Sequence, residues 1–279
     1  MKICRIISTK DEILSGIYDP SRPDEARIVN GAPFGELQVT KRKEKIKSFL
    51  PPVEPCAIFA LGFNYGKHIA ETGFKKPGTP VVFMKAPSCA IGQGEAILLP
   101  LAGPDKVDYE GELAIIIGKK GKNIPVSRAM DYIWGYTCAN DVSARDWQLD
   151  PAMEQNGQFV RGKSFDTFCP LGPAAVTKDE IPHPNDLSLR TILNGQVVQE
   201  SRTDNMVFDI PAIVSDLSRS LTLLPGTVIL TGTPEGVGFI RQPPLFLKEG
   251  DKITVEIEAI GALTNMVKRE RDTVTRERV

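Results

Sequence analysis

The sequence predicts an α+β fold in which strands dominate and helices are few. Short apolar runs rich in β-branched residues recur along the chain, at 81–84, 113–117, 228–230 and 253–257. Turn-forming residues separate these runs, and the chain has 22 prolines and 24 glycines. Neither a repeating strand–helix alternation nor an internal repeat is visible. We therefore expect a strand-rich fold and not a doubly wound parallel sheet.

Three segments are expected to be helical. The segment 127–135 has Ser127 as a candidate N-cap and Gly135 as a stop, and the segment 209–220 has Pro211 in its first turn. The basic segment 41–49, KRKEKIKSF, is expected to form one or two helical turns with a solvated face.

The chain has 279 residues, near the upper limit for a single hydrophobic core. The proline-rich stretch LPPVEP at 50–55 is stiff and cannot continue a helix, and the sequence changes character after it. We therefore expect a small variable N-terminal domain at 1–55 and a main domain at 56–279.

Composition and charge exclude several classes of function. The net charge is −1, so no basic surplus exists to neutralise nucleic-acid phosphates. The longest apolar runs are too short for a membrane span, and the N-terminus meets charges too early for a signal peptide. The five cysteines are scattered and never spaced as CxxC, which argues against a disulfide framework or a zinc site. We expect a cytoplasmic protein that binds neither nucleic acid nor membrane.

Glu110 and Glu112 stand two residues apart at the start of an apolar run, in the stretch VDYEGELAIII. On a strand, residues i and i+2 point to the same face, whereas on a helix they do not face each other. Gly111 disfavours a helix and the isoleucines favour a strand. Two carboxylates side by side at a buried strand repel each other, so either solvent or a cation must lie near them.

Asp141 follows the next candidate strand and has two interpretations. It could cap a helix over VSARDW, which is a common role for aspartate. It could also join Glu110 and Glu112 as a third oxygen ligand. Three carboxylates without clustered Cys or His suit Mg²⁺ or Mn²⁺ better than zinc.

Three more candidates have an ordinary alternative. Lys163 is either a surface lysine in a Gly- and Pro-rich turn or a fixed positive charge for an anionic intermediate. Thr233 lies in the turn TGTPEGVG, which either reverses the chain or presents N–H groups and a hydroxyl to an anion. His68 and Glu71 meet if their segment is helical, and would then form a general base; otherwise they are ordinary surface residues.

Taken together, eight stretches resemble the fumarylacetoacetate hydrolase family. They occur in the expected order between about residues 56 and 267, and read GFNYGKHIAE, FMKAPS, DYEGELAIIIGK, GYTCANDVSARDWQ, GKSFDTFCPLGP, LNGQVVQ, TGTPEGVG and FLKEGDKITVEIE. Ala259 and Thr264 depart from the family pattern, which usually has Gly and Arg there.

The resemblance implies a mixed β-sandwich roll, a homodimer and a site that uses Mg²⁺ or Mn²⁺. It implies roles for nine residues that match the motifs. The metal ligands would be Glu110, Glu112 and Asp141; the catalytic residues His68, Glu71 and Lys163; and the substrate-side residues Arg145, Gln148 and Thr233.

The main functional expectation from the resemblance is a metal-dependent hydrolase. It would cleave a C–C bond in an acylpyruvate or another diketo acid, so the expected partner is a small 2-oxo acid. The alternatives are an oxaloacetate-type 2-oxo-acid decarboxylase or a 2-hydroxyhepta-2,4-diene-1,7-dioate isomerase on the same site. A catalytically silent binding protein is a further alternative, but the complete set of site residues argues against it.

Overall fold

The computed structural model describes residues 1–102, 105–149 and 158–271 of the chain. The expected strand-dominated α+β fold is confirmed. The strands of the described part are β1 Lys2–Ser8, β2 Ile13–Tyr18, β3 Glu25–Asn30, β4 Gln38–Leu50, β5 Ala57–Gly62, β6 Val81–Lys85, β7 Ala90–Ile91, β8 Ile97–Leu99, β9 Val107–Asp108, β10 Gly111–Ile117, β11 Ile133–Asn140, β12 Ser143–Ala144, β13 Cys169–Thr177, β14 Ser188–Leu193, β15 Gln196–Arg202, β16 Thr227–Leu230, β17 Lys252–Ile257 and β18 Gly261–Arg269. The α-helices there are α1 Gly66–Thr72, α2 Arg145–Gln148, α3 Phe159–Lys163 and α4 Ile210–Ser220.

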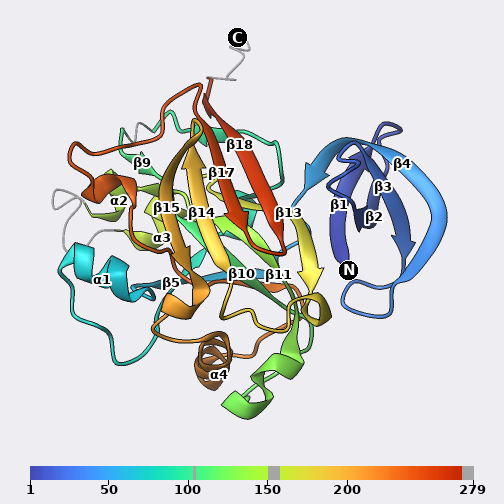
Figure 1. Cartoon of the computed structure of the whole chain (residues 1–279), viewed down its shortest axis with the longest axis horizontal. Coiled ribbons are helices and arrows are strands. Elements are labelled where there is room, and N and C mark those ends of the chain that lie inside the picture. Colours follow the sequence, from blue (N-terminus) through green and yellow to red (C-terminus); the bar gives the residue numbers. More distant parts are fainter. Residues whose placement is uncertain (103–104, 150–157, 272–279) are drawn as a thin grey trace, which may run out of the picture.

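The first four strands form a closed ring. β1 pairs with both β2 and β4, and β3 closes the ring between them. This ring lies to one side of the molecule and joins the rest of the large sheet where β1 pairs with β13 (Figure 1). β4 ends at Leu50 and β5 begins at Ala57. The domain boundary proposed between 1–55 and 56–279 stays a prediction.

The site is built on two packed sheets. The large sheet continues from β13 through β11, β10, β16 and β5 to β6, and a five-stranded sheet runs in the order β15-β14-β17-β18-β8. Leu113 and Ile115 of β10 share one hydrophobic core with Leu189 of β14 and Val255 of β17. β10 is buried along its whole length, as its unbroken apolar run requires.

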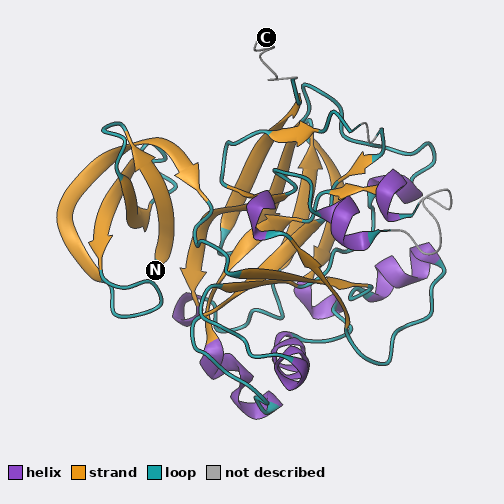
Figure 2. Ribbon diagram, turned by 180° about the vertical axis from the view of Figure 1, so that it is seen from behind, coloured by secondary structure: helices purple, strands orange, loops and turns teal. Residues whose placement is uncertain are grey.

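Helix α4 closes the end of this core and confirms the expected helix at 209–220. The Asp209 side chain caps it by accepting a hydrogen bond from the Ala212 N–H, and a proline stands in the first turn. Helices α1, α2 and α3 lie on the side of the molecule away from the N-terminal ring (Figure 2). No helix in the described part of the chain is long and apolar enough to cross a membrane.

One helix prediction is wrong and a second is correct only in part. Residues 41–49 belong to strand β4, whose edges pair with β1 and β3; these distant strands override the local helix preference of the lysines. The segment 127–135 forms a 3₁₀ helix over Val126–Tyr132, and β11 begins directly after it. Pro125, and not Ser127, stands at the N-cap position of that helix.

Candidate metal and proton-transfer site

The three predicted carboxylate ligands come together. Glu110 and Glu112 flank Gly111 at the start of β10, and Asp141 follows the neighbouring strand β11. The Asp141 N–H donates to the Glu110 carbonyl at 2.8 Å, which fixes the two turns against each other. Carboxylate oxygens of all three residues lie within 4.8 Å of one another, and all three side chains are buried.

Gly111 is required by the close approach of the second sheet. A Cβ at this position would lie 2.0 Å from the hydroxyl oxygen of Thr191 on β14. The Gly111 N–H also donates to the side-chain oxygen of Gln199 on β15, at 3.0 Å. The sequence ExE thus places two glutamates on either side of a contact that only glycine can make.

Three buried basic side chains form ion pairs with the acidic cluster. The Lys163 ammonium donates to Glu110 at 2.6 Å and to Asp141 at 2.7 Å, and the Lys85 ammonium donates to Asp141 at 2.5 Å. Arg145 donates to Glu110 at 2.6 Å and to Asp108 at 2.9 Å. Burial opposes ionisation of Glu110, but Lys163 and Arg145 outweigh it and lower its pKa to about 2.

Glu112 has no such partner. Its Oε2 atom accepts a hydrogen bond of 2.6 Å from the Gly232 N–H, while its Oε1 atom is buried with no hydrogen-bond partner among the described residues. Burial, and then the charges of Asp141 and Glu110, raise the pKa of Glu112 well above its usual value. A buried, unsatisfied carboxylate oxygen beside two more carboxylates is the environment that a hard divalent cation would complete.

The charges of the cluster agree with this fit. Asp108, Glu110 and Asp141 are each paired with at least one of the three cations, and Glu112 is the carboxylate left over. A divalent ion beside Glu112 would leave the cluster with one excess positive charge. That balance suits an anionic substrate.

His68 and Glu71 form the expected pair on helix α1. The His68 Nδ1 atom lies 2.7 Å from Glu71 Oε1, and both carboxylate oxygens of Glu71 lie 3.1 Å from the Gly236 N–H that donates to them. A carboxylate partner keeps the imidazole proton on Nδ1 and leaves Nε2 as the basic nitrogen. The structure therefore presents His68 as a group able to accept a proton.

One cavity contains the three residues expected on the substrate side, Arg145, Gln148 and Thr233. His68, Glu110 and Lys163 line the same cavity. The cavity has a volume of about 430 Å³. The Gln148 side-chain oxygen accepts a hydrogen bond of 2.7 Å from Arg145, and its amide N–H groups donate to no other described residue. The Thr233 hydroxyl donates to the Gly111 carbonyl at 3.1 Å and accepts from Gln199 at 2.8 Å, so it braces the ExE turn.

A separate cavity of about 500 Å³ lies against the N-terminal ring and contains none of the predicted site residues.

Sequence reasoning missed two members of the cluster. Lys85, at the end of β6, is almost fully buried, and Asp141 raises its pKa although burial acts in the opposite direction. Asp108 is fully buried and accepts hydrogen bonds from Arg145, Gly238 and Phe239. Lys85 could have been noticed because it is a lone lysine directly after the apolar run VVFM. Asp108 could have been noticed because it is a third acid in the stretch DYEGE.

The helix-cap interpretation of Asp141 is wrong. Helix α2 begins at Arg145 with Ala144 at its N-cap position, and β12 lies between Asp141 and that helix. Lys163 is also not a surface lysine, because it is the buried last residue of α3.

A family model for the C-terminal domain of fumarylacetoacetate hydrolase matches residues 57–268. The chain belongs to this family. The curated relatives of this family member include the mitochondrial oxaloacetate tautomerase fahd2 of Xenopus laevis, which is 45% identical over 90% of this chain and 80% of its own length.

Solved structures agree with this assignment. A 5-carboxymethyl-2-hydroxymuconate delta-isomerase from Mycobacterium smegmatis is 41% identical with a TM-score of 0.83, and the match covers 97% of this chain and 100% of that one. A 2-hydroxyhepta-2,4-diene-1,7-dioate isomerase from Mycobacterium marinum is 39% identical with a TM-score of 0.81, over 97% and 99% of the two chains. This family member is therefore an enzyme of the superfamily, and the names of these relatives favour the isomerase alternative. C–C bond hydrolysis, the main expectation from sequence, is not confirmed.

Proposed function

We propose that this protein is a divalent-metal-dependent isomerase that interconverts the keto and enol forms of a small 2-oxo acid. The observation that supports it most is that one cavity is lined by His68, whose Nδ1 lies 2.7 Å from Glu71, and by Glu110, Lys163 and Arg145 of the buried carboxylate–cation cluster. Isomerisation needs only a proton acceptor, a stabilised oxyanion and an oriented substrate. The residues that line the cavity can supply all three.

Glu110, Glu112 and Asp141 would hold the metal. Bound there, Mg²⁺ or Mn²⁺ would supply Lewis-acid polarisation and orientation of the substrate oxygens. The unsatisfied Glu112 oxygen supports this assignment, as does the mutual proximity of the three carboxylates.

His68 would move the proton. Its Nε2 would take a proton from the carbon next to the 2-oxo group and return it to oxygen, or act in the reverse direction. Glu71 would stabilise the charged imidazolium through the 2.7 Å bond to Nδ1. The Gly236 N–H holds Glu71 in place, so the ring orientation is fixed before substrate binds.

Lys163 would stabilise the negative charge that forms on the substrate oxygen. Two of its three N–H donors are bonded to Glu110 and Asp141, and the third has no hydrogen-bond partner among the described residues and could serve a ligand. Arg145 would act differently, because it holds Glu110 and Gln148 in position.

The test separates isomerisation from hydrolysis and decarboxylation. Oxaloacetate, a 2-hydroxydienedioate and several acylpyruvates would be incubated in D₂O with Mg²⁺ or Mn²⁺, with enzyme-free controls. We expect enzyme-dependent deuterium incorporation at C3, followed by NMR, without release of CO₂ or of a cleaved acid by mass spectrometry. Release of pyruvate and a carboxylic acid as the main products would instead restore the hydrolase hypothesis.

The role of His68 is tested by two histidine variants. His68→Ala should abolish proton exchange at C3 while leaving Mg²⁺ affinity unchanged, because the imidazole is the proposed base and not a metal ligand. His183→Ala is the matched control, since this histidine lies exposed in a turn. Equal exchange rates in the two variants would show that the base lies elsewhere.

We also propose that the protein is a homodimer that pairs through the edge strand β6. This strand pairs with β5 alone in the described structure and exposes Val81, Val82 and Met84. An apolar sheet edge left in water promotes association. Light scattering should show a dimer that dissociates in Met84→Lys but not in the control Ile13→Lys; a monomeric parent protein would refute the proposal.

A further inference from the structure

The cavity has a second character besides its charged residues. Five phenylalanines line it, and they come from five separate segments of the chain: Phe63, Phe74, Phe83, Phe159 and Phe239. The rings of Phe63 and Phe74 are 4.8 Å apart between centroids, and those of Phe83 and Phe159 are 5.7 Å apart. Distances in this range are typical of aromatic side chains that pack on one another. We call these five side chains the aromatic wall.

Of the aromatic wall, only Phe83 packs against a hydrophobic core cluster, and the other four members belong to none in the described part of the chain. None of its members is fully buried, and Phe74 is 59% exposed. Aromatic surface that gathers in a concave site and remains open to solvent is typical of ligand pockets. A four-carbon acid would leave most of a cavity of about 430 Å³ unfilled.

Phe63 connects this wall to the proposed base. Its backbone has a φ of +56°, a left-handed conformation that is unfavourable for a bulky side chain. Its ring stacks on the His68 imidazole, with 6.5 Å between the ring centroids and an angle of 15° between the ring planes. Strained backbone of this kind tends to persist where the site needs the side chain in one place.

The positive charges that line the cavity already contact the acidic cluster. Among the described residues they belong to Arg145 and Lys163. The Nε, Nη1 and Nη2 atoms of Arg145 donate to Asp108, Gln148 and Glu110. Its guanidinium lies 4.3 Å from the Phe239 ring centroid, and the Lys163 ammonium lies 5.2 Å from that of Phe83. The aromatic wall therefore covers one side of each cation.

Among the described residues that line the cavity, only Arg145 and Lys163 carry a positive charge, so a second carboxylate on the substrate finds no further cation there. Lys75 and Lys76 are exposed and do not line the cavity. The stretch 150–157, outside the described residues, reads DPAMEQNG and contains no lysine or arginine. A carboxylate placed against phenylalanine rings without a cation would lose its hydration and gain nothing in exchange.

We infer that the part of the substrate distal to the 2-oxo-acid group is uncharged and apolar, with a flat aromatic group fitting best. This inference rests on the proposed function, because the 2-oxo-acid group must bind at the acidic cluster for its distal part to meet the aromatic wall. It separates this protein from an enzyme built for dicarboxylic acids.

Three oxamates test the inference by calorimetry, with Mg²⁺ and the intact protein. They share the chelating head of a 2-oxo acid and differ only beyond it: oxamate has the head alone, N-phenyloxamate adds a phenyl ring, and N-oxalylglycine adds a carboxylate. N-phenyloxamate should bind at least tenfold more tightly than N-oxalylglycine, at one site per chain. Equal or tighter binding of N-oxalylglycine would overturn the inference.

The same three probes distinguish the inference from the proposed function. If oxamate itself fails to bind in the presence of Mg²⁺, the proposed 2-oxo-acid site is wrong and the inference is wrong with it. If oxamate binds and the phenyl ring adds no affinity, only the inference is wrong. Binding of N-phenyloxamate that does not need Mg²⁺ would place the ring in another cavity, and would also overturn it.

A variant locates the effect on the aromatic wall. Phe74 is the most exposed member, so Phe74→Ala should fold normally. It should weaken N-phenyloxamate several-fold and leave oxamate affinity unchanged. The control Phe208→Ala changes a phenylalanine that does not line the cavity and should affect neither. An unchanged affinity of Phe74→Ala for N-phenyloxamate would show that the ring does not contact the wall.

Discussion

Two lysine–aspartate pairs of this protein have the same nitrogen–oxygen distance, but one pair is exposed to solvent and the other is buried. Lys47 and Asp11 in the N-terminal ring lie 2.5 Å apart, as do Lys85 and Asp141 at the site. The side chains of the first pair are 57% and 72% exposed, and those of the second pair are both 0% exposed. Water hydrates the charges of the first pair and screens their attraction. In the second pair, the attraction between the two charges must compensate for the hydration that both lose on burial.

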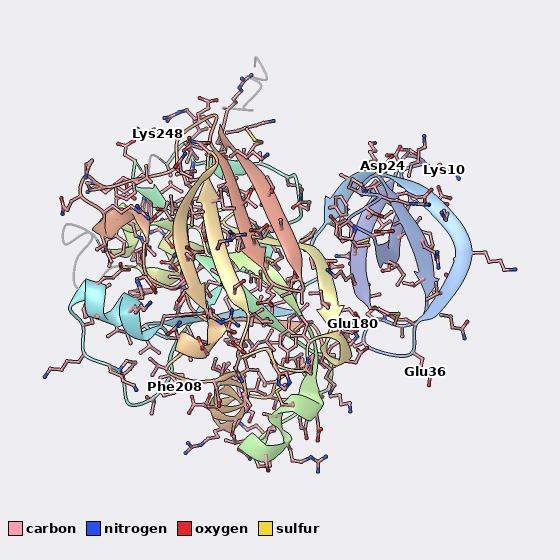
Figure 3. All side chains as sticks on the ribbon, viewed as in Figure 1. Lys10, Asp24, Glu36, Glu180, Phe208 and Lys248 are labelled. Carbon is pink, nitrogen blue, oxygen red and sulfur yellow. The ribbon has the colours of Figure 1, made fainter. Side chains whose placement is uncertain are left out.

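The wider surroundings of the two pairs differ in the same way. The ring has further ion pairs that contact solvent, including the one between Lys43 and Glu25, and Lys10, at the top of the ring in Figure 3, pairs with the buried Glu44 from its exposed side. At the site, each buried cation instead contacts at least one carboxylate of a continuous network. Equal distances therefore imply different consequences for mutation. The exposed pairs are screened by solvent, whereas the members of the buried network hold one another in position.

The largest effect is expected at Glu112, the network member that lacks a cation. Glu112→Gln should weaken metal binding more than any other single change proposed here, because it replaces an anionic oxygen ligand with a neutral amide oxygen and removes the charge that favours a divalent ion. The metal-free variant should be no less stable than the parent, since the repulsion from Asp141 and Glu110 disappears. Mg²⁺ should then raise the melting temperature of the parent only.

Glu200→Gln is the matched control, because Glu200 is an exposed glutamate on β15. It should keep the parent's metal affinity and its response to Mg²⁺. Unchanged metal affinity in Glu112→Gln would remove this residue from the proposed ligand set.

The second largest effect is expected at Lys85. Lys85→Met leaves Asp141 buried with one cation fewer, and breaking a buried ion pair from one side typically costs about 3–5 kcal/mol of unfolding free energy. Urea unfolding would measure this loss. The double variant Lys85→Met/Asp141→Asn should recover part of the stability, because it no longer buries an under-compensated charge. A loss below about 1 kcal/mol in the single variant would mean that the pair behaves like a surface pair.

The sequence predicted those parts of the fold that depend on local pattern. The apolar run of β10 and the capped helix α4 are examples, since each follows from residues that are neighbours in the chain. The paired glutamates are another, because the two-residue period of a strand places them on one face. Family motifs added the proposed roles of His68 and Lys163, which the residues alone left undecided.

The features that the sequence missed depend on distant partners. Strand β4 was expected to be partly helical because its lysines favour a helix locally, but pairing with β1 and β3 decides its conformation. Lys85 looked like an ordinary strand end, because its partner Asp141 is 56 residues away. The aromatic wall likewise joins five segments, and no local pattern brings them together.

The smallest effect is expected at Lys47, where the substitution repeats that at Lys85. Lys47→Met removes the same charge from a pair of the same length, but exposed pairs contribute only about 0.2–1 kcal/mol. Most of even this contribution should disappear at 1 M salt, where the screening length is about 3 Å. The loss at Lys85 should persist at that salt concentration, because its pair is out of contact with solvent. Urea unfolding of both variants at low and high salt checks the comparison directly. A salt-insensitive loss of several kcal/mol at Lys47 would show that burial does not explain the difference between the two pairs.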